Sequence, residues 1–458
     1  MKKFISFLLC AVLLCTALPV AAFAAAEEPF VPVLRFIACS DSHVKTENDL
    51  TFNRIGAMLN QVYALTDADP VYPNLDALMM AGDLTHDGTK AEFQKYWTAV
   101  SAAKHESTDL LAVVAKSHDG WGMTRKKMRG FFSDLTGEAP DFHKVICGYH
   151  FIGLSVSDND AVQYSKKQLS WLREQLDKAV ADTPDRPVFF MHHEHNRNTV
   201  YGSSTYDGWG VTFFNKILQD YPQVVDFSGH SHYPLNDPRS IWQGAYTAIG
   251  TGALFYAEFT IDADRAYKSP DCEACGTYWI VEVNAKGDVH LTGFDVDANK
   301  VLCEYTLPNP ADPQNRPYTP EKRQAASKAP VFADDAALSV QTFAGGCTVT
   351  APVAASADGM PVVLYRAYAK NTTGRKVLKS WTLPCYYRAV DLKTVELKLD
   401  GLTPGDYTVG VVAENAYGGG SQPLETAVHI EKMGGIGSLF ARIAAWFTEL
   451  WALLVKHL

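Results

Sequence analysis

"VVDFSGHSHYPLND", residues 224–237, joins an apolar run to a small residue, a glycine and two histidines. The apolar run predicts a buried strand, and His230 and His232 follow directly behind it. Gly229 lets the backbone come close to its neighbours without a side chain in the way. Because imidazole is a common metal ligand in proteins, this stretch predicts a metal site if other strands supply the remaining ligands.

Residues 33–304 form the first predicted domain. Short apolar runs such as "VLRFIACSD" and "LDALMMAGD" alternate with amphipathic stretches such as "LTFNRIGAMLNQVYAL". Runs of the first kind are typical of strands and stretches of the second kind of helices. The order predicts an α/β domain in which β-sheets are layered against each other and flanked by helices.

Each predicted strand of this domain ends in a polar cluster. The clusters are Asp41 with His43, Asp83, Ser117 with His118 and Asp119, His192 with His193, and His230 with His232. Side chains at strand ends in such a domain converge on one crevice. Carboxylates and imidazoles together are a suitable ligand set for two divalent ions.

In this order, the series D-x-H, G-D, x-H-D, H and G-H-x-H resembles the calcineurin-like metallophosphoesterase superfamily over roughly residues 33–296. The resemblance implies that the first ion is bound by Asp41, His43, Asp83 and His232. It implies that the second is bound by the bridging Asp83, by His192, by His230 and by the residue at position 117, Ser117. His192 is preferred because the family's histidine directly follows the apolar strand, and His193 is the alternative.

The resemblance also implies a mechanism. Two divalent ions would bind the phosphate oxygens and a hydroxide that attacks phosphorus. His118 would protonate the leaving oxygen or stabilise its charge, and Asp119 would orient His118. Arg197 and Arg239, each just beyond a ligand motif, are candidates for holding a remote anion, with ordinary surface arginines as the alternative. The metals (iron, manganese or zinc) and the substrate, a phosphomonoester or a phosphodiester, stay open.

Ser117 departs from the family, which nearly always has asparagine there. Serine is shorter and its hydroxyl is a weak neutral ligand. A water molecule or Asn196 could fill the gap, but in either case the second ion is expected to bind less tightly than the first. This departure keeps a second interpretation open, in which the domain is a catalytically weakened protein that binds at a surface.

The start of the chain predicts export. Two lysines, an apolar run and Ala22-Phe23-Ala24 are typical of a signal peptide over residues 1–24. The protein is therefore expected to be secreted or associated with the cell surface.

Its net charge is −10 at pH 7 and becomes −12 without the two lysines of this segment, which argues against nucleic-acid binding. Seven of nine cysteines remain after it, and the C-x-x-C pair Cys272 and Cys275 predicts a local disulfide or free thiols.

The remaining chain divides into three parts. Residues 305–330 are rich in proline and predict a linker or an extended strap. Residues 331–431 show short alternating strands, which predict an immunoglobulin-like β-sandwich, and they resemble a fibronectin type III domain through Leu402, Pro404 and Tyr407. Residues 434–458 predict an amphipathic helix for contact with a membrane surface, for self-association or for docking on the preceding domain.

Overall fold

The computed structural model of the chain describes residues 29–46 and 50–431. The predicted signal peptide and the predicted terminal helix lie outside the described residues. Within the described ranges, no helix combines the length and the apolar character that crossing a bilayer requires.

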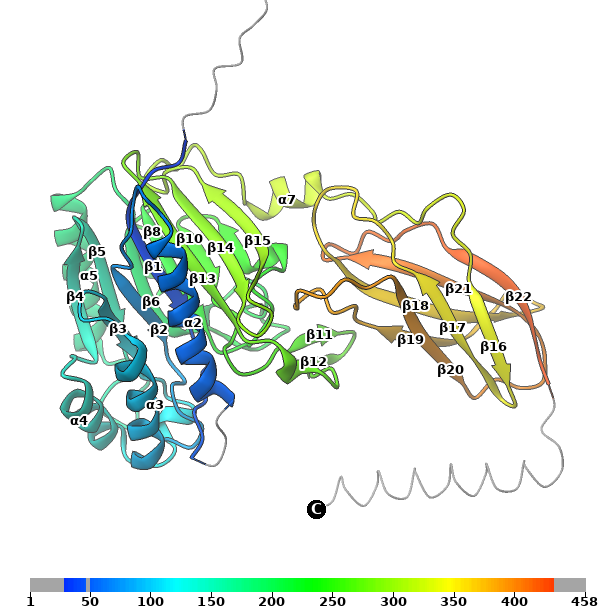
Figure 1. Cartoon of the computed structure of the whole chain (residues 1–458), viewed down its shortest axis with the longest axis horizontal. Coiled ribbons are helices and arrows are strands. Elements are labelled where there is room, and N and C mark those ends of the chain that lie inside the picture. Colours follow the sequence, from blue (N-terminus) through cyan, green and yellow to red (C-terminus); the bar gives the residue numbers. More distant parts are fainter. Residues whose placement is uncertain (1–28, 47–49, 432–458) are drawn as a thin grey trace, which may run out of the picture. The chain divides into compact units, whose positions relative to one another are not determined.

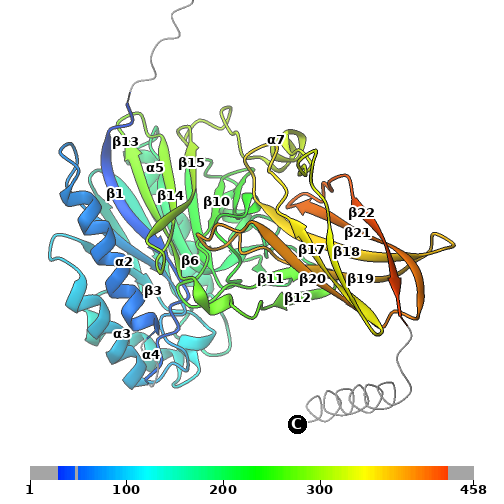
Figure 2. The ribbon, with the colours of Figure 1, turned by 45° about the vertical axis from the view of Figure 1, so that its right-hand side comes forward.

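The first sheet has six strands (Figures 1 and 2). In spatial order they are β15 (Lys300–Leu307), β14 (Val289–Asp295), β13 (Thr277–Asn284), β1 (Pro32–Cys39), β2 (Ala77–Ala81) and β3 (Asp109–Val113). β1, β2 and β3 are parallel, while β13, β14 and β15 continue the sheet in antiparallel fashion. The three parallel strands all end at the same edge of the sheet.

The second sheet has seven strands. Six follow the order β4 (Asp141–Ile146), β5 (Tyr149–Leu154), β6 (Val188–Asn196), β8 (Val224–Gly229), β10 (Thr247–Gly250) and β9 (Ile241–Gln243), and β7 (Gly210–Val211) pairs with β6. β5, β6, β8 and β10 are parallel to one another. This sheet therefore also brings several strand ends to one edge.

Helices cover the outer faces of both sheets. Those along the chain are α2 (Leu50–Asp67), α3 (Lys90–Ala103), α4 (Arg125–Thr136), α5 (Lys166–Asp182) and α6 (Asn215–Leu218). Two of them begin at well-formed caps: Thr89 with Glu92 starts α3, and Ser165 with Gln168 starts α5, each pair forming a capping box. Figure 2 shows α2 and α3 against the sheet that contains β1.

Three apolar cores separate these layers. Phe36 on β1 and Phe189 on β6 belong to the core between the two sheets. Ile37, the residue after Phe36, belongs to the core under α2 and α3, and Phe190 belongs to the core under α5. Because side chains alternate along a strand, β1 and β6 each supply two cores. The predicted layered α/β architecture is therefore confirmed as helix, sheet, sheet and helix.

The proline-rich segment 305–330 packs against the first domain. β15 continues to Leu307, and the segment contains helix α7 (Pro320–Ala326). Arg316 Nη2 donates to the carbonyl of Pro222 at 2.7 Å, and Tyr318 N donates to Gln243 Oε1 at 2.9 Å. The segment is thus a strap held by hydrogen bonds.

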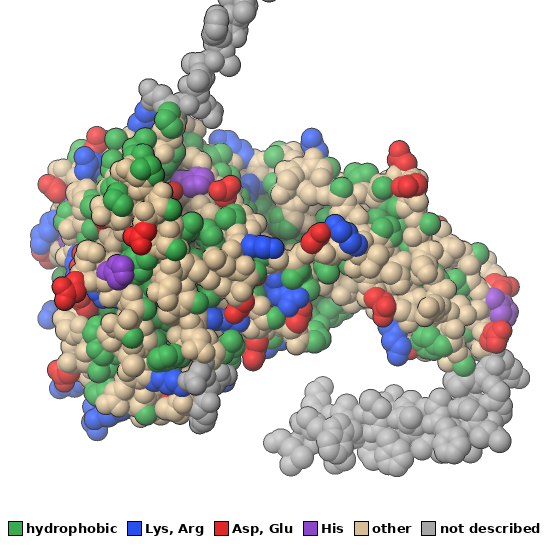
Figure 3. Space-filling model, in the orientation of Figure 1, with side chains coloured by type: hydrophobic (Ala, Val, Ile, Leu, Met, Phe, Trp, Pro, Cys, Tyr) green, Lys and Arg blue, Asp and Glu red, His purple; other side chains and the backbone are tan. Residues whose placement is uncertain are grey.

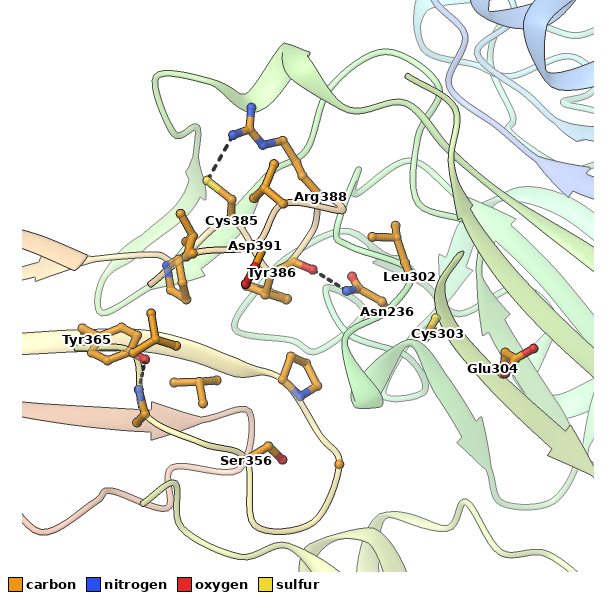
Figure 4. Close-up of a pocket in the computed structure, with 18 of the residues that line it drawn as sticks. Asn236, Leu302, Cys303, Glu304, Ser356, Tyr365, Cys385, Tyr386, Arg388 and Asp391 are labelled. Atoms are coloured by element: carbon orange, nitrogen blue, oxygen red, sulfur yellow. Dashed lines mark hydrogen bonds between the residues drawn. The ribbon is translucent and has the colours of Figure 1, made fainter. Parts of the chain in front are cut away.

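A cavity of about 500 Å³ lies beside β15 (Figure 4). Asn236 Nδ2 donates to the carbonyl of Tyr386 at 2.5 Å there, and Arg388 Nη2 donates to Cys385 Sγ at 3.3 Å. None of the candidate metal ligands lines this cavity.

All seven cysteines of the described residues, including Cys272 and Cys275, are free thiols.

The C-terminal part is all β. A three-stranded sheet consists of β16 (Ser339–Phe343), β17 (Gly346–Pro352) and β20 (Thr394–Asp400). A four-stranded sheet consists of β19 (Lys376–Thr382), β18 (Val362–Asn371), β21 (Gly405–Asn415) and β22 (Leu424–Ile430). Both sheets contribute to one apolar core. The hydroxyl of Tyr407 lies 3.0 Å from the carbonyl oxygen of Thr403, the contact expected of a tyrosine corner. The fibronectin type III type of this domain stays a prediction.

Candidate metal centre

Two loops that follow β1 and β2 run side by side. Asp41 N donates to the carbonyl of Gly82 at 3.0 Å, and His43 N donates to the carbonyl of Asp83 at 3.0 Å. These bonds extend the parallel pairing of the two strands beyond their ends. The third loop, after β8, joins them because His230 N donates to Asp41 Oδ2 at 3.0 Å. The backbone thus assembles three strand ends at one place.

The backbone at this place is strained. Left-handed φ angles occur at Asp41 (53°), His43 (43°), Asp83 (49°), His230 (72°) and His232 (56°). Residues other than glycine rarely adopt such angles, and each costs on the order of 1–3 kcal/mol. Five strained residues that are all candidate ligands indicate that the fold places these side chains for function.

A first group of ligand atoms consists of Asp41, His43 and His232. Asp41 Oδ1 lies 3.1 Å from His232 Nε2 and 3.7 Å from His43 Nε2. The two Nε2 atoms lie 3.0 Å apart. All three side chains are buried.

A second group consists of Asp83, His193 and His230. His193 Nε2 lies 3.1 Å from Asp83 Oδ2 and 3.2 Å from His230 Nδ1. Asp83 Oδ2 also lies 3.9 Å from His43 Nε2 of the first group. The same carboxylate oxygen therefore faces both groups, which is the position expected of a bridging ligand.

The choice of His192 as a ligand is wrong in this geometry. Met191 and His193 lie on the face of β6 toward the first sheet, whereas Phe190 and His192 lie on the opposite face. His192 Nε2 is 3.1 Å from Asp226 Oδ1, and its ring packs against aromatic side chains under the outer helices. The structure brings His193, the alternative, to Asp83.

Asn196 does not reach the centre either. Its Nδ2 donates to Asp226 Oδ2 at 2.8 Å, on the same outer face as His192. It therefore does not replace the oxygen ligand that an asparagine at position 117 would provide.

Backbone acceptors orient the imidazoles. His193 Nδ1 lies 2.8 Å from the carbonyl of Ala81, and His232 Nδ1 lies 3.2 Å from the carbonyl of Tyr256. A carbonyl accepts only from N–H, so the proton sits on Nδ1 and the lone pair of Nε2 points into the cluster. Facing nitrogen lone pairs repel each other unless a cation lies between them.

The carboxylates favour positive charge here. Burial alone would raise the pKa of Asp41, but the neighbouring His232 outweighs it and holds this pKa well below its usual range. Burial would lower the pKa of His193, but the charge of Asp83 raises it well above its usual value, so without a metal ion a proton on Nε2 takes the place that a cation would occupy. Asp41 Oδ1 is buried and has no hydrogen-bond partner. The six side chains therefore fit two divalent ions, with one carboxylate between them.

Ser117 contacts the bridging carboxylate. Its Oγ donates to Asp83 Oδ1 at 2.7 Å, which leaves Oδ2 directed at the two groups of ligands. Ser117 precedes the short 3₁₀ helix His118–Gly120. Its observed contact is thus one that orients a candidate ligand.

The partner of His118 differs from the prediction. Its Nδ1 lies 2.7 Å from the backbone carbonyl of His86, and its ring centroid lies 4.2 Å from that of His43. The Asp119 carboxylate instead accepts from Thr85 N at 2.9 Å, from Thr85 Oγ1 at 2.8 Å and from Ala115 N at 3.0 Å. Asp119 therefore holds the loops together, and the His86 carbonyl orients His118.

The two arginines are committed elsewhere. Arg197 donates to the carbonyl of Gly210 through Nε and Nη2. Arg239 pairs with Asp237, at 2.8 Å from Nη2 to Oδ2, and its guanidinium lies 3.7 Å from the ring centroid of Tyr201. These contacts are with residues other than the six ligands, so the structure gives no support to a role in anion binding.

Several residues that the sequence did not single out support the centre. His195 contacts Ser228 Oγ at 2.9 Å and Ser231 Oγ at 2.7 Å, the residues on either side of Gly229 and His230. A Cβ at Gly229 would overlap the side chains of Ser40 and Asp41, so only glycine fits there. The sequence signal for His195 is its place on the same face of β6 as His193.

A buried cluster of aspartates and histidines lies at the ends of parallel strands, between two sheets, and is the class of site that could hold metal ions. The model of the family described as calcineurin-like phosphoesterase matches residues 34–234. Residues 34–234 are therefore similar to calcineurin-like phosphoesterases, and the match supports a hydrolase that acts on phosphoric ester bonds.

The similar proteins cover part of the chain. A probable glycerophosphodiester phosphodiesterase of Arcobacter nitrofigilis is 25% identical over 166 residues, which are 34% of this chain and 56% of that protein. The chain thus spans little more than half the length of this relative. A purple acid phosphatase from yellow lupin is 12% identical, with a TM-score of 0.43, over 60% of this chain and 53% of its own. A 5'-nucleotidase precursor from Thermus thermophilus has the same identity and coverage and a TM-score of 0.30.

Proposed function

We propose that the chain is an exported, metal-dependent phosphoesterase with a dinuclear centre. The observation that carries the proposal is Asp83 Oδ2, which faces His193 Nε2 at 3.1 Å and His43 Nε2 at 3.9 Å and so joins two ligand groups. Two divalent ions bound there would neutralise charge on the phosphate and activate a water molecule.

The residues of the chain have separate tasks in this proposal. Asp41, His43 and His232 would hold one ion, and His193 and His230 would hold the other together with Asp83. His118 donates from Nδ1 to the His86 carbonyl, so its Nε2 is the atom that can carry a proton to the leaving oxygen. Ser117 would keep Asp83 in its bridging orientation.

Metal removal tests the proposal. The full chain without residues 1–24 is purified, its metal content is measured, and hydrolysis of p-nitrophenyl phosphate and bis(p-nitrophenyl) phosphate is followed before and after treatment with a chelator. We expect bound divalent metal, hydrolysis of at least one ester, loss of activity with the chelator and recovery with added manganese, iron or zinc. Full activity in metal-free protein would refute the assignment.

A catalytically weakened, surface-binding protein is the second candidate. The observation that favours it is that position 117 is a serine, which has no amide oxygen for a metal and whose hydroxyl donates a hydrogen bond to Asp83. The same experiment separates the two functions, because this candidate binds metal but hydrolyses neither ester.

We also propose that residues 434–458 attach the exported protein to a membrane surface or to a second copy. Arg442, Glu449 and Lys456 recur every seven residues in an otherwise apolar stretch.

Acidic and basic side chains are interspersed on the face of the molecule shown in Figure 3. A phosphate ester is the expected partner at the metal centre, and no nucleic acid is expected because the chain is acidic.

A further inference from the structure

Trp121 lies exposed beside the candidate proton donor. Its side chain is 60% exposed, and its ring centroid lies 4.0 Å from that of His118, with 38° between the ring planes. An indole exposed to this extent contributes little to a core. Its position therefore calls for a role outside the core.

The backbone places Trp121 over His118. Residues 118–120 form a 3₁₀ helix, and Trp121 N donates to the carbonyl of His118 at 3.3 Å. Side chains three residues apart in such a helix lie one above the other. The turn is locked, because Asp119 binds Thr85 and Ala115, and a Cβ at Gly122 would overlap the backbone of Gly88. Trp121 is thus held next to His118 by the turn rather than by its own burial.

The rings form a continuous row that leads to the centre. Successive ring centroids are 4.0 Å apart from Trp121 to His118, 4.2 Å from His118 to His43 and 5.7 Å from His43 to Phe255. Lys45 Nζ lies 4.8 Å from the Phe255 ring centroid. Because His43 is a candidate ligand, the part of this row from Trp121 to His43 runs from solvent to the candidate metal centre.

We infer that Trp121 is a specificity-determining residue that stacks on a planar aromatic leaving group of the phosphate ester. This inference rests on the proposed function. In the reaction, the water oxygen loses one proton to solvent and forms a bond to phosphorus as the bond to the leaving oxygen breaks. The leaving oxygen takes a proton from Nε2 of His118 in its doubly protonated form. A leaving group whose oxygen lies at His118 has its ring beside the indole, where stacking favours a flat ring over a saturated one.

Matched substrates test this inference on the metal-loaded full chain. Benzyl phosphate and cyclohexylmethyl phosphate differ in the flatness of one ring, and their methyl diesters provide the same pair for a diesterase. We expect kcat/KM to favour the benzyl esters about tenfold, mainly through KM, because stacking acts on the bound substrate and on the transition state alike. Trp121→Leu should reduce the preference to about one, and Trp121→Phe should retain most of it.

Phe343→Leu provides the control, since Phe343 is an exposed ring on β16 of the C-terminal sheets. Urea midpoints within experimental error of the wild type would show that the variants are folded. Equal kcat/KM for the two rings in the wild type, or an unchanged preference in Trp121→Leu, would overturn the inference.

Binding of benzylphosphonate and cyclohexylmethylphosphonate, measured by calorimetry, separates this inference from the proposed function. Neither phosphonate is hydrolysed. Tighter binding of benzylphosphonate that is lost in Trp121→Leu supports the aromatic subsite even if no ester is turned over. Equal binding of the two phosphonates contradicts it even if both esters are hydrolysed.

Discussion

Ser117 Oγ donates a hydrogen bond of 2.7 Å to Asp83 Oδ1, the carboxylate whose other oxygen lies 3.1 Å from His193 Nε2. The residue that departs from the family pattern therefore contacts the residue that joins the two ligand groups. An asparagine at position 117 would offer an amide oxygen as a metal ligand, whereas the serine orients the bridge.

We predict that Ser117 leaves the two ions unequally bound. One ion should stay through purification and the second should depend on added metal, because the second group has only Asp83, His193 and His230. Ser117→Asn should tighten the second ion roughly 10–100-fold and raise turnover at limiting metal. Metal titration with calorimetry measures both, and Ser101→Asn on the exposed face of α3 is the control. Two equally tight ions in the wild type would contradict this prediction.

The histidine pair on β6 gives a prediction with an internal control. His193→Ala should lower the metal content and abolish most activity, because it removes a side chain that faces Asp83 and His230. His192→Ala should keep the metal content but lower the free energy of unfolding by roughly 1–3 kcal/mol, because it leaves Asp226 buried with one partner fewer. Metal analysis and urea unfolding of both variants decide it. Loss of metal in His192→Ala but not in His193→Ala would show that His192, the ligand predicted from the sequence, binds the metal.

Asp83→Asn should be more damaging than the loss of a single histidine. Its carboxylate faces both groups of ligands, so its loss should weaken both ions, whereas His230→Ala should weaken one. We expect metal stoichiometry to fall furthest in Asp83→Asn, together with kcat/KM. A stoichiometry equal to that of the wild type would show that Asp83 does not bridge.

Stability should depend on acid pH through Asp69. The hydrogen bond from Arg35 lowers the pKa of the Asp69 carboxyl to about 2. A carboxyl whose pKa is lower in the folded than in the unfolded protein stabilises the fold when the pH is above its pKa in the unfolded protein. This contribution is lost as the pH falls from about 4 toward about 2. In metal-free protein, Asp69→Asn should flatten the decline of the unfolding midpoint over this window. Parallel curves for the variant and the wild type would argue against this assignment.

Deletion of residues 434–458 should leave catalysis intact and abolish binding to lipid vesicles or self-association. Vesicle sedimentation and analytical ultracentrifugation of the full and shortened chains measure the two outcomes. Identical behaviour of both chains would favour the remaining alternative, a helix docked on the preceding domain.

The sequence by itself determined the layered α/β domain and the strand ends that carry the ligands. The alternation of apolar residues predicts strands that bury both faces, as Phe189 and Phe190 do on β6. The spacing of Asp41 with His43 and of His230 with His232 identified both loops, and the resemblance implied Asp83 as the bridge, which stays a proposal. These features are local, so a linear pattern can carry them.

Only the tertiary structure decided between His192 and His193. Neighbours in a strand point to opposite faces, and both faces of β6 are apolar before this point, so no polarity in the sequence shows which face meets the first sheet. The register of β6 against β5 and β8 sets that face. The same holds for His118, whose acceptor is a backbone carbonyl of His86, because a hydrogen bond between loops distant in the sequence exists only once the sheet has brought their strands together.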